Sequence, residues 1–281
     1  MERITKVAAI QVVAQKDRAD TLKRTTELID IATKEGSKIV CLPQLFNLPW
    51  FAHTMDRENF NLAEDEQGTT LTSLREIAAS KGIVLIAPLF EKAGDRYFNT
   101  AFVIGTDGSI IGRYRKVHVP QIPLWEERFY FSPGDTGFPV FQTPFARIGV
   151  QICWDAFFPE GFRVLALKGA EVVFVPTAAA FYHSRLKWER SLSASAHANG
   201  FFVFRVNRVG KEEKQDFYGR SFCVGPDGEF LVKPVGSSEG IVVATLDLNL
   251  INTIRNEWVF LRDRRPEVYR LIAGDDEEER T

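Results

Sequence analysis

The stretches KIVCLPQLF (residues 38–46) and EVVFVPTAA (residues 171–179) share one pattern, an apolar, strand-forming run that ends at a proline. Such short apolar runs are typical of strands buried on both faces. A second pair, AFVIGTDGSIIG (101–112) and SFCVGPDGEFLV (221–232), follows in the same order, and each has a central Asp-Gly dipeptide of the kind that forms hairpin turns. The sequence therefore indicates two similar halves.

Hydrophobic periodicity around these stretches predicts the same order of elements in both halves: strand, helix, strand, helix, strand, hairpin. In the first half we expect strands at 7–13, 38–43 and 83–90, helices at 20–34 and 70–81, and a hairpin over 100–114. In the second half we expect strands at 146–153, 171–176 and 201–206, helices at 160–168 and 185–199, and a hairpin over 220–233. Two βαβαββ halves predict an α/β fold with four layers, an αββα sandwich in which two sheets pack face to face between outer helices.

Two separate α/β domains are the alternative, and they would need a flexible linker near the midpoint of the chain. The only candidate, residues 120–139, is rich in aromatic and charged side chains and does not resemble a Gly/Ser tether. We therefore favour one domain over residues 1–270. Beyond a further helix near 249–258 the chain stays apolar, which suggests packing on this or another subunit, and it closes with an acidic tail over 271–281.

Composition excludes several classes of protein. The 281 residues include 35 Lys and Arg against 37 Asp and Glu, a net charge of −2, which argues against nucleic-acid binding. No apolar window reaches the ~18 residues of a membrane helix, and no signal peptide is recognisable at the start. The odd, widely spaced cysteines (Cys41, Cys153 and Cys223) form no CxxC pair, which argues against a disulfide framework or zinc site and favours a reducing, cytoplasmic compartment. The composition is therefore most simply interpreted as that of a soluble enzyme without a metal.

Three residues stand where an α/β fold gathers its ligands, just past the carboxyl ends of strands. Gln44 follows the strand 38–43, Lys116 follows the outgoing arm of the first hairpin, and Cys153 ends the strand 146–153. Each also has an ordinary structural explanation, because a cysteine is often a small buried hydrophobe and a lone lysine a solvated charge. Position alone leaves both readings open.

Several motifs in the right order carry a resemblance that covers nearly the whole chain: KVAAIQVVAQKDRADTLKRTTELIDIA (6–32), IVCLPQLF (39–46), GRYRKVHVP (112–120), FYFSPGDTGFPVF (129–141), RIGVQICWDAFFPEGFRVLALKGAEVVFVPTA (147–178) and WVFLRDRRPEVY (258–269). They resemble the nitrilase, or carbon-nitrogen hydrolase, superfamily, and within it most the N-carbamoylputrescine amidase branch. The resemblance implies an αββα sandwich, a small amide or N-carbamoyl substrate, no metal or organic cofactor, and a homodimer or larger homo-oligomer.

The catalytic set that the resemblance implies is a glutamate, a lysine and a cysteine, with a second glutamate nearby. The lysine matches Lys116, the cysteine matches Cys153, and the second glutamate is matched best by Glu127 in WEERFYF (125–131). The position of the general-base glutamate departs from the family pattern, since PQLF (43–46) places Gln44 there.

Hydrolysis of a C–N bond by a thiol explains why that departure matters. The thiol must lose a proton, the tetrahedral oxyanion needs donors, for which we expect the Lys116 ammonium and the Trp154 backbone N–H, and the leaving nitrogen must gain a proton. A carboxamide at Gln44 keeps the shape of glutamate but carries no proton at neutral pH. We therefore expect a chain that binds substrate and turns it over slowly.

Several alternatives stay open at this point. Gln44 fits an engineered change from glutamate or a natural glutamine, and Glu127 could compensate for it. A natural pseudoenzyme that binds an amide ligand without cleaving it is a second reading. A Cys-His mechanism through His118 is a third, although the resemblance favours Lys116 and leaves His118 a structural role.

The sequence after the cysteine bears on the substrate. The tripeptide CWD resembles amidases and carbamoylases more than true nitrilases, which favours N-carbamoyl amines or small amides over nitriles. Relatives that act on N-carbamoyl amino acids tend to have arginines where this chain has Ala156, Phe157 and Phe158, so an apolar or amine-bearing substrate is favoured. Trp125, Trp154 and Ala178 are expected to line the pocket, and N-carbamoyl amino acids and nitriles remain alternatives.

Overall fold

The computed structural model describes residues 3–274, and they form two six-stranded mixed sheets. In the first sheet β1, β2 and β3 are parallel neighbours, and antiparallel strands flank them on both sides. Its strands lie in the order β14 (Gly240–Asp247), β1 (Ile4–Gln11), β2 (Ile39–Cys41), β3 (Val84–Ala93), β4 (Arg96–Ile104) and β5 (Ile110–Arg115).

The second sheet repeats this arrangement. Its parallel centre is formed by β7, β8 and β9, again between antiparallel strands. The order is β13 (Phe230–Val232), β12 (Phe222–Val224), β9 (Phe202–Asn207), β8 (Val172–Thr177), β7 (Arg147–Val150) and β6 (Val140–Gln142). A separate two-stranded ribbon joins β10 (Val209–Lys211) to β11 (Asp216–Tyr218). The prediction of two similar halves is confirmed.

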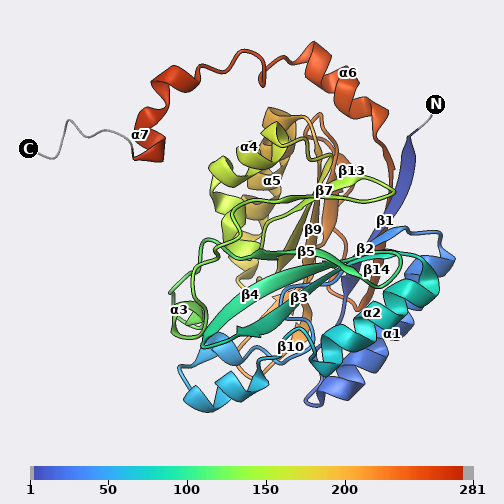
Figure 1. Cartoon of the computed structure of the whole chain (residues 1–281), viewed down its shortest axis with the longest axis vertical. Helices are drawn as coiled ribbons and strands as arrows, with labels where there is room; N and C mark the ends of the chain where they lie inside the picture. Colours follow the sequence, from blue (N-terminus) through green and yellow to red (C-terminus); the bar gives the residue numbers. More distant parts are fainter. Residues whose placement is uncertain (1–2, 275–281) are drawn as a thin grey trace, which may run out of the picture.

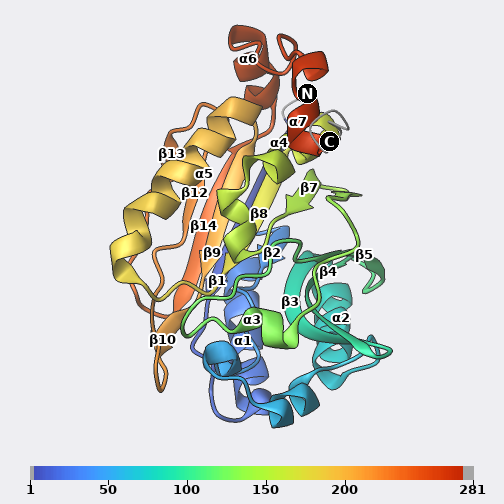
Figure 2. The same cartoon turned by 90° about the vertical axis from the view of Figure 1, so that its left-hand side faces the viewer.

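Helices cover the outer face of each sheet, as Figure 2 shows with α2 and α5 on opposite sides of the molecule. Alternate residues of β1 explain the layers, because successive side chains of a strand point to opposite faces. Ala8 and Ile10 pack with α1 (Arg18–Lys34) and α2 (Thr69–Lys81), whereas Val7 and Ala9 belong to the core shared with the second sheet. The helices on the second sheet are α4 (Pro159–Leu167) and α5 (Arg185–Asn199). The predicted αββα sandwich is confirmed.

The sequence patterns did not reveal two of the strands, β14 and β6, and β14 ties the two halves together. Strand β14 comes after the second half in the chain but pairs with β1 over eight residue pairs, from Ile4–Asp247 to Gln11–Gly240. Strand β6 holds the matching position beside β7. The stretch 120–139, considered above as a linker, contains the short helix α3 (Glu127–Tyr130), and both ends of α3 are buried.

The two strands that lead into the candidate site end earlier than predicted. The strand expected over 38–43 ends at Cys41, and the strand expected over 146–153 ends at Val150. Beyond Val150 the Ile152 N–H donates to the Asp155 carboxylate (2.9 Å) instead of continuing the sheet, so Cys153 opens the 3₁₀ helix η3 (Cys153–Phe157). Placement of Cys153 on a strand was therefore wrong.

The C-terminal segment forms an arm that arches away from the sheets (Figure 1). It contains α6 (Asn249–Glu257), η5 (Pro266–Val268) and α7 (Arg270–Ala273), and its exposed side chains include Trp258, Phe260, Leu271 and Ile272. Most of the predicted acidic tail, residues 275–281, lies outside the described residues. Remaining short 3₁₀ helices are η1 (Phe51–His53), η2 (Arg57–Leu62) and η4 (Tyr182–Ser184). Within residues 3–274, no helix has the length and apolar character needed to cross a membrane.

Candidate active site

Three of the candidate side chains meet at one carboxylate oxygen. The Lys116 ammonium lies 2.6 Å from Glu127 Oε2, and the side-chain amides of Gln44 and Asn99 each donate to the same oxygen at 3.4 Å. All four residues are buried, with at most 1% of their surface exposed. One acceptor atom on each of Gln44, Asn99 and Glu127 has no hydrogen-bond donor among the described residues. The cluster can therefore accept further N–H groups.

The chain brings this cluster together from separate elements of the first half. Gln44 lies three residues past β2, Lys116 directly follows β5, and Asn99 lies on β4, whose neighbour is β5. Glu127 is the first residue of α3 and reaches the strand ends from outside the sheet. Gln44 and Lys116 thus lie just past the carboxyl ends of strands, as ligands of α/β folds usually do.

Cys153 lies in the same electrostatic environment. Its burial raises the pKa of the thiol, the Lys116 ammonium opposes that shift, and the Glu127 carboxylate adds to it. The Ala178 backbone N–H lowers the pKa of the thiol and so favours the thiolate. Because the pKa of Cys153 is raised on balance, the resting group is a thiol that has to give up its proton to react.

Lys116 keeps its charge despite complete burial. Desolvation lowers the pKa of the ammonium. Attraction to Glu127, Cys153 and Asp155 and the hydrogen bond to Glu127 raise the pKa by more than desolvation lowers it, so the net shift is upward. A permanent cation thus lies beside the thiol, where it can stabilise negative charge on sulfur or on a substrate oxygen.

The backbone at Cys153 has φ of +50°, a left-handed conformation that is strained for any residue other than glycine, asparagine or aspartate. Strained backbone of this kind occurs at active sites, where the surrounding structure has to enforce it. Here Asp155 enforces it, because this fully buried carboxylate accepts the Ile152 N–H at 2.9 Å and the Tyr114 hydroxyl at 2.7 Å. Since Tyr114 lies on β5, Asp155 fixes the turn that carries Cys153 to the strand that Lys116 directly follows.

His118 belongs to this scaffold. Its backbone N–H donates to Asp155 Oδ1 (2.9 Å), its Nδ1 lies 2.8 Å from the same oxygen, and its ring stacks on Phe158 at 3.7 Å. These contacts support the structural role expected for His118.

Replacement of Asp155 by alanine is expected to lower the free energy of unfolding by about 3 kcal/mol, because it leaves several buried donors unpaired around the lost charge. Urea titration followed by circular dichroism measures this change. The exposed Glu76→Ala is the control, and its expected effect is within about 0.5 kcal/mol. Equal stability of the Asp155→Ala and Glu76→Ala variants would contradict the scaffold role.

Arg208 fixes the loop that carries Gln44. This buried guanidinium, just past β9 of the second sheet, donates to Leu45 O and Leu48 O at 2.8 Å and pairs with Glu212 at 2.6 Å. Sequence reasoning missed Arg208, Asn99 and Asp155. The position of Arg208 after a strand was the one available signal, whereas the other two are defined only by their contacts.

A cavity of about 330 Å³ opens onto Cys153. The structure places the expected Trp125, Trp154 and Ala178 in its wall, and the Trp125 indole donates to Ala178 O at 3.1 Å. The remaining lining residues are Pro120, Ile122, Phe157, Ala179, Ala180, Phe181, His183, Ser184, Lys187 and Trp188. This wall is largely apolar, so it can exclude water from a small bound molecule.

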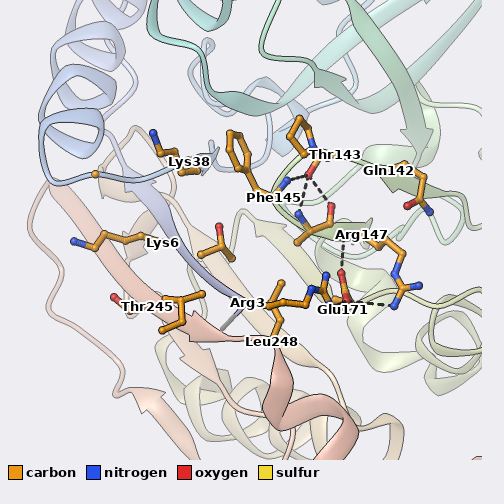
Figure 3. A pocket seen from close by; sticks show the side chains of 15 residues that line it. Arg3, Lys6, Lys38, Gln142, Thr143, Phe145, Arg147, Glu171, Thr245 and Leu248 are labelled. Atoms are coloured by element: carbon orange, nitrogen blue, oxygen red, sulfur yellow. Dashed lines mark hydrogen bonds and ion pairs between the residues drawn. The ribbon is translucent and has the colours of Figure 1, made fainter. Parts of the chain in front are cut away.

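A second, larger hollow of about 760 Å³ lies where β1 and β7 begin, and Figure 3 shows Arg3 and Arg147 meeting there at Glu171. None of the candidate catalytic residues lines it. Within residues 3–274, no group of three or more His, Cys, Asp or Glu side chains is placed to hold a metal ion.

Known proteins match this chain along almost its full length. The model of the carbon-nitrogen hydrolase family matches residues 6–256. The N-carbamoylputrescine amidase of Solanum tuberosum is 37% identical over 96% of this chain and 95% of its own. The crystal structure of a carbon-nitrogen hydrolase from Helicobacter pylori G27 matches with a TM-score of 0.92 and 35% identity over 96% of this chain and 98% of its own.

An amidase from Nesterenkonia sp. AN1 is a useful comparison for Gln44, because its structures include a glutamate-to-glutamine mutant. It is 27% identical with a TM-score of 0.82, over 96% of this chain and 97% of its own. Its structures include a glutamate-to-glutamine mutant with the acetamide moiety of fluoroacetamide bound covalently to the active-site cysteine, and the same mutant after Michael addition of acrylamide at that cysteine.

Proposed function

The chain belongs to the carbon-nitrogen hydrolase family, and we propose that Cys153 is the nucleophile with which it cleaves non-peptide C–N bonds of amides or N-carbamoyl compounds. The observation that carries this proposal is the shared environment of Cys153, the buried Lys116 ammonium and the Glu127 carboxylate. The other two cysteines, Cys41 and Cys223, lie in the core without such neighbours, and burial raises the pKa of each thiol.

The proposed reaction proceeds through a thioester. The Cys153 sulfur attacks the carbonyl carbon, and the thiol proton passes to the departing nitrogen, which leaves as ammonia from a primary amide or a terminal urea. The Lys116 ammonium and the Trp154 backbone N–H stabilise the oxyanion. Water then cleaves the thioester, releasing a carboxylic acid, or a carbamic acid that decomposes to CO₂ and an amine.

Gln44 limits this cycle in our proposal. It holds the position at which the family has its general base, and its amide contacts Glu127, but it relays no proton. Glu127 is the second candidate for the base, because its Oε1 has no hydrogen-bond donor among the described residues. A binding protein without turnover is the alternative if neither group moves the proton.

Acrylamide provides a test that does not depend on turnover. We expect it to label Cys153 at least about tenfold faster than Cys41 or Cys223, because Cys153 lines a cavity and has a cation beside it, whereas the other two thiols are fully buried in the core. Peptide mass spectrometry of the native chain after timed exposure measures the three rates. Uniform labelling of all three thiols, or labelling of the other two first, would remove Cys153 as nucleophile.

Two further expectations belong to the same proposal. The homodimer or larger homo-oligomer expected of the family is supported by the apolar side chains exposed on the arm, Trp258, Phe260, Leu271 and Ile272. The reducing, cytoplasmic compartment is supported by the three free thiols.

A further inference from the structure

The wall of the cavity beside Cys153 carries positive charge and no negative charge among the described residues. Among the described residues that line it, Lys187 is the only one with a charged side chain, and no Asp or Glu takes part. The other titratable groups in the wall are Cys153 and His183. Cys153 is buried and Lys187 is exposed, which puts the reacting thiol at the bottom of the cavity and the cation at its mouth.

The N-terminus of α5 adds positive charge beside Lys187. A helix N-terminus carries a partial positive charge and is stabilised by acidic side chains, but the first turn of α5 has none and holds Arg185 and Lys187 instead. Ser184 at the cap makes no side-chain capping hydrogen bond to the helix, so the helix end lacks that compensation as well.

Two carboxylates adjacent in sequence to lining residues, Glu189 and Glu126, lie outside the cavity wall. Glu189, one turn further along α5, pairs with Arg220 at 2.8 Å. Glu126, next to the lining residue Trp125, accepts a hydrogen bond from Gln121 and does not itself line the cavity. Within the described residues, Lys187 forms no ion pair with a carboxylate. A helix that starts with two cations and no acidic side chain breaks a local rule of stability, and such exceptions often occur at functional positions.

We propose that Lys187 selects substrates whose far end carries a carboxylate. This inference rests on the proposed function, in which the amide or N-carbamoyl carbonyl binds at Cys153. A cavity of about 330 Å³ holds a short chain, so a molecule that reacts at the bottom has its far end near the mouth. A carboxylate there meets Lys187 and the helix end, both of which attract it.

An amine at the far end meets the opposite situation. Aromatic faces such as those of Trp154 and Trp188 can attract a cation, but the same amine is repelled by Lys187 and finds no carboxylate in the wall. The charge of the cavity therefore opposes the amine-bearing substrate that the residues after Cys153 suggested. The apolar Phe157 in the wall fits either tail through its methylene groups.

Three ureas of matched length test the proposal: those derived from γ-aminobutyrate, from n-butylamine and from putrescine. Their far ends are anionic, neutral and cationic, and their reacting ends are identical. In ammonia-release assays of the Gln44→Glu enzyme we expect kcat/KM for the anionic urea to exceed that of the neutral one roughly five- to tenfold, and the cationic urea to be the poorest. This preference should shrink as ionic strength rises.

Substitutions at Lys187 separate a selective role from a structural one. We expect Lys187→Gln to remove the preference and Lys187→Glu to reverse it, so that the ratio of kcat/KM for the anionic urea to that for the neutral urea falls about five- to tenfold in Lys187→Gln. Lys34→Gln, at the end of α1 in the opposite helix layer, should keep the full preference. Hydrolysis of the neutral urea with no charge preference, or a preference unaltered in Lys187→Glu, overturns this inference alone, whereas no hydrolysis of any urea or small amide overturns the proposed function.

Discussion

Replacement of Gln44 by glutamate is expected to raise the rate of ammonia release about 10²- to 10⁴-fold, the usual contribution of a positioned general acid and base. The Gln44 amide already lies 3.4 Å from Glu127 Oε2, so the new carboxylate would occupy the same buried cluster. A carboxylate at position 44 can accept the thiol proton and return it to the leaving nitrogen, which the glutamine amide cannot do.

The measurement is the steady-state rate of ammonia release from a panel of N-carbamoyl compounds and primary amides, with the wild-type chain and the variant side by side. Gln44→Leu is the matched control, since it fills the same space without a carboxylate and should show no gain. A Gln44→Glu variant no faster than wild type would show that position 44 is not the base position. If Glu127→Gln then abolished wild-type turnover, the role would pass to Glu127.

Replacement of Cys153 by alanine is expected to reduce ammonia release to the uncatalysed background, a loss of roughly 10⁴- to 10⁶-fold in the Gln44→Glu background. The reason is that Lys116 and Glu127 stabilise charge and move protons but form no bond to the carbonyl carbon. The same ammonia assay with purified Cys153→Ala protein measures the loss, and urea titration verifies that the variant is folded.

Cys41→Ala and Cys223→Ala are the controls for a general effect of thiol removal. Both side chains lie in the core, one on each sheet, and burial raises the pKa of each thiol, so neither thiol is reactive. We expect each variant to keep its activity within about twofold. Full activity in Cys153→Ala, or complete loss in either control, would contradict the assignment of the nucleophile.

Local patterns predicted the central elements of this fold well. Helix α5 spans residues 185–199 as predicted, and α4 differs from its prediction by one residue at each end. Both are closed by a glycine with positive φ, Gly200 and Gly169, which is a strong local signal for a helix end. The repeat itself came from paired apolar strands, which are also local features.

The parts that sequence reasoning missed depend on distant contacts. Strand β14 exists because residues 240–247 pair with β1 at the other end of the chain, and three-residue strands such as β6 carry too little pattern to be recognised. The strand before Cys153 ends early because the Asp155 side chain captures the Ile152 N–H. Hydrophobic periodicity does not predict a hydrogen bond of this kind between a side chain and the backbone.

The candidate site shows the same division. Gln44, Lys116 and Cys153 were found because they follow strands, and the structure brings Gln44, Lys116 and Glu127 into one hydrogen-bonded cluster beside the thiol. Asn99, Asp155 and Arg208 act through buried hydrogen bonds between segments far apart in sequence. Lys187 likewise has no sequence signal, because its place in the wall of the cavity depends on the fold.

Mass analysis of the reacting enzyme tests the central claim, a thioester on Cys153, most directly. Rapidly quenched samples of the wild-type chain and of Gln44→Glu, mixed with a cleavable amide or urea, should each contain protein heavier by one acyl or carbamoyl group. Peptide mapping should place that group on Cys153, and it should persist longer in the wild type, where Gln44 activates no water. Release of ammonia without any such adduct, together with an undiminished rate in Cys153→Ala, would contradict the account.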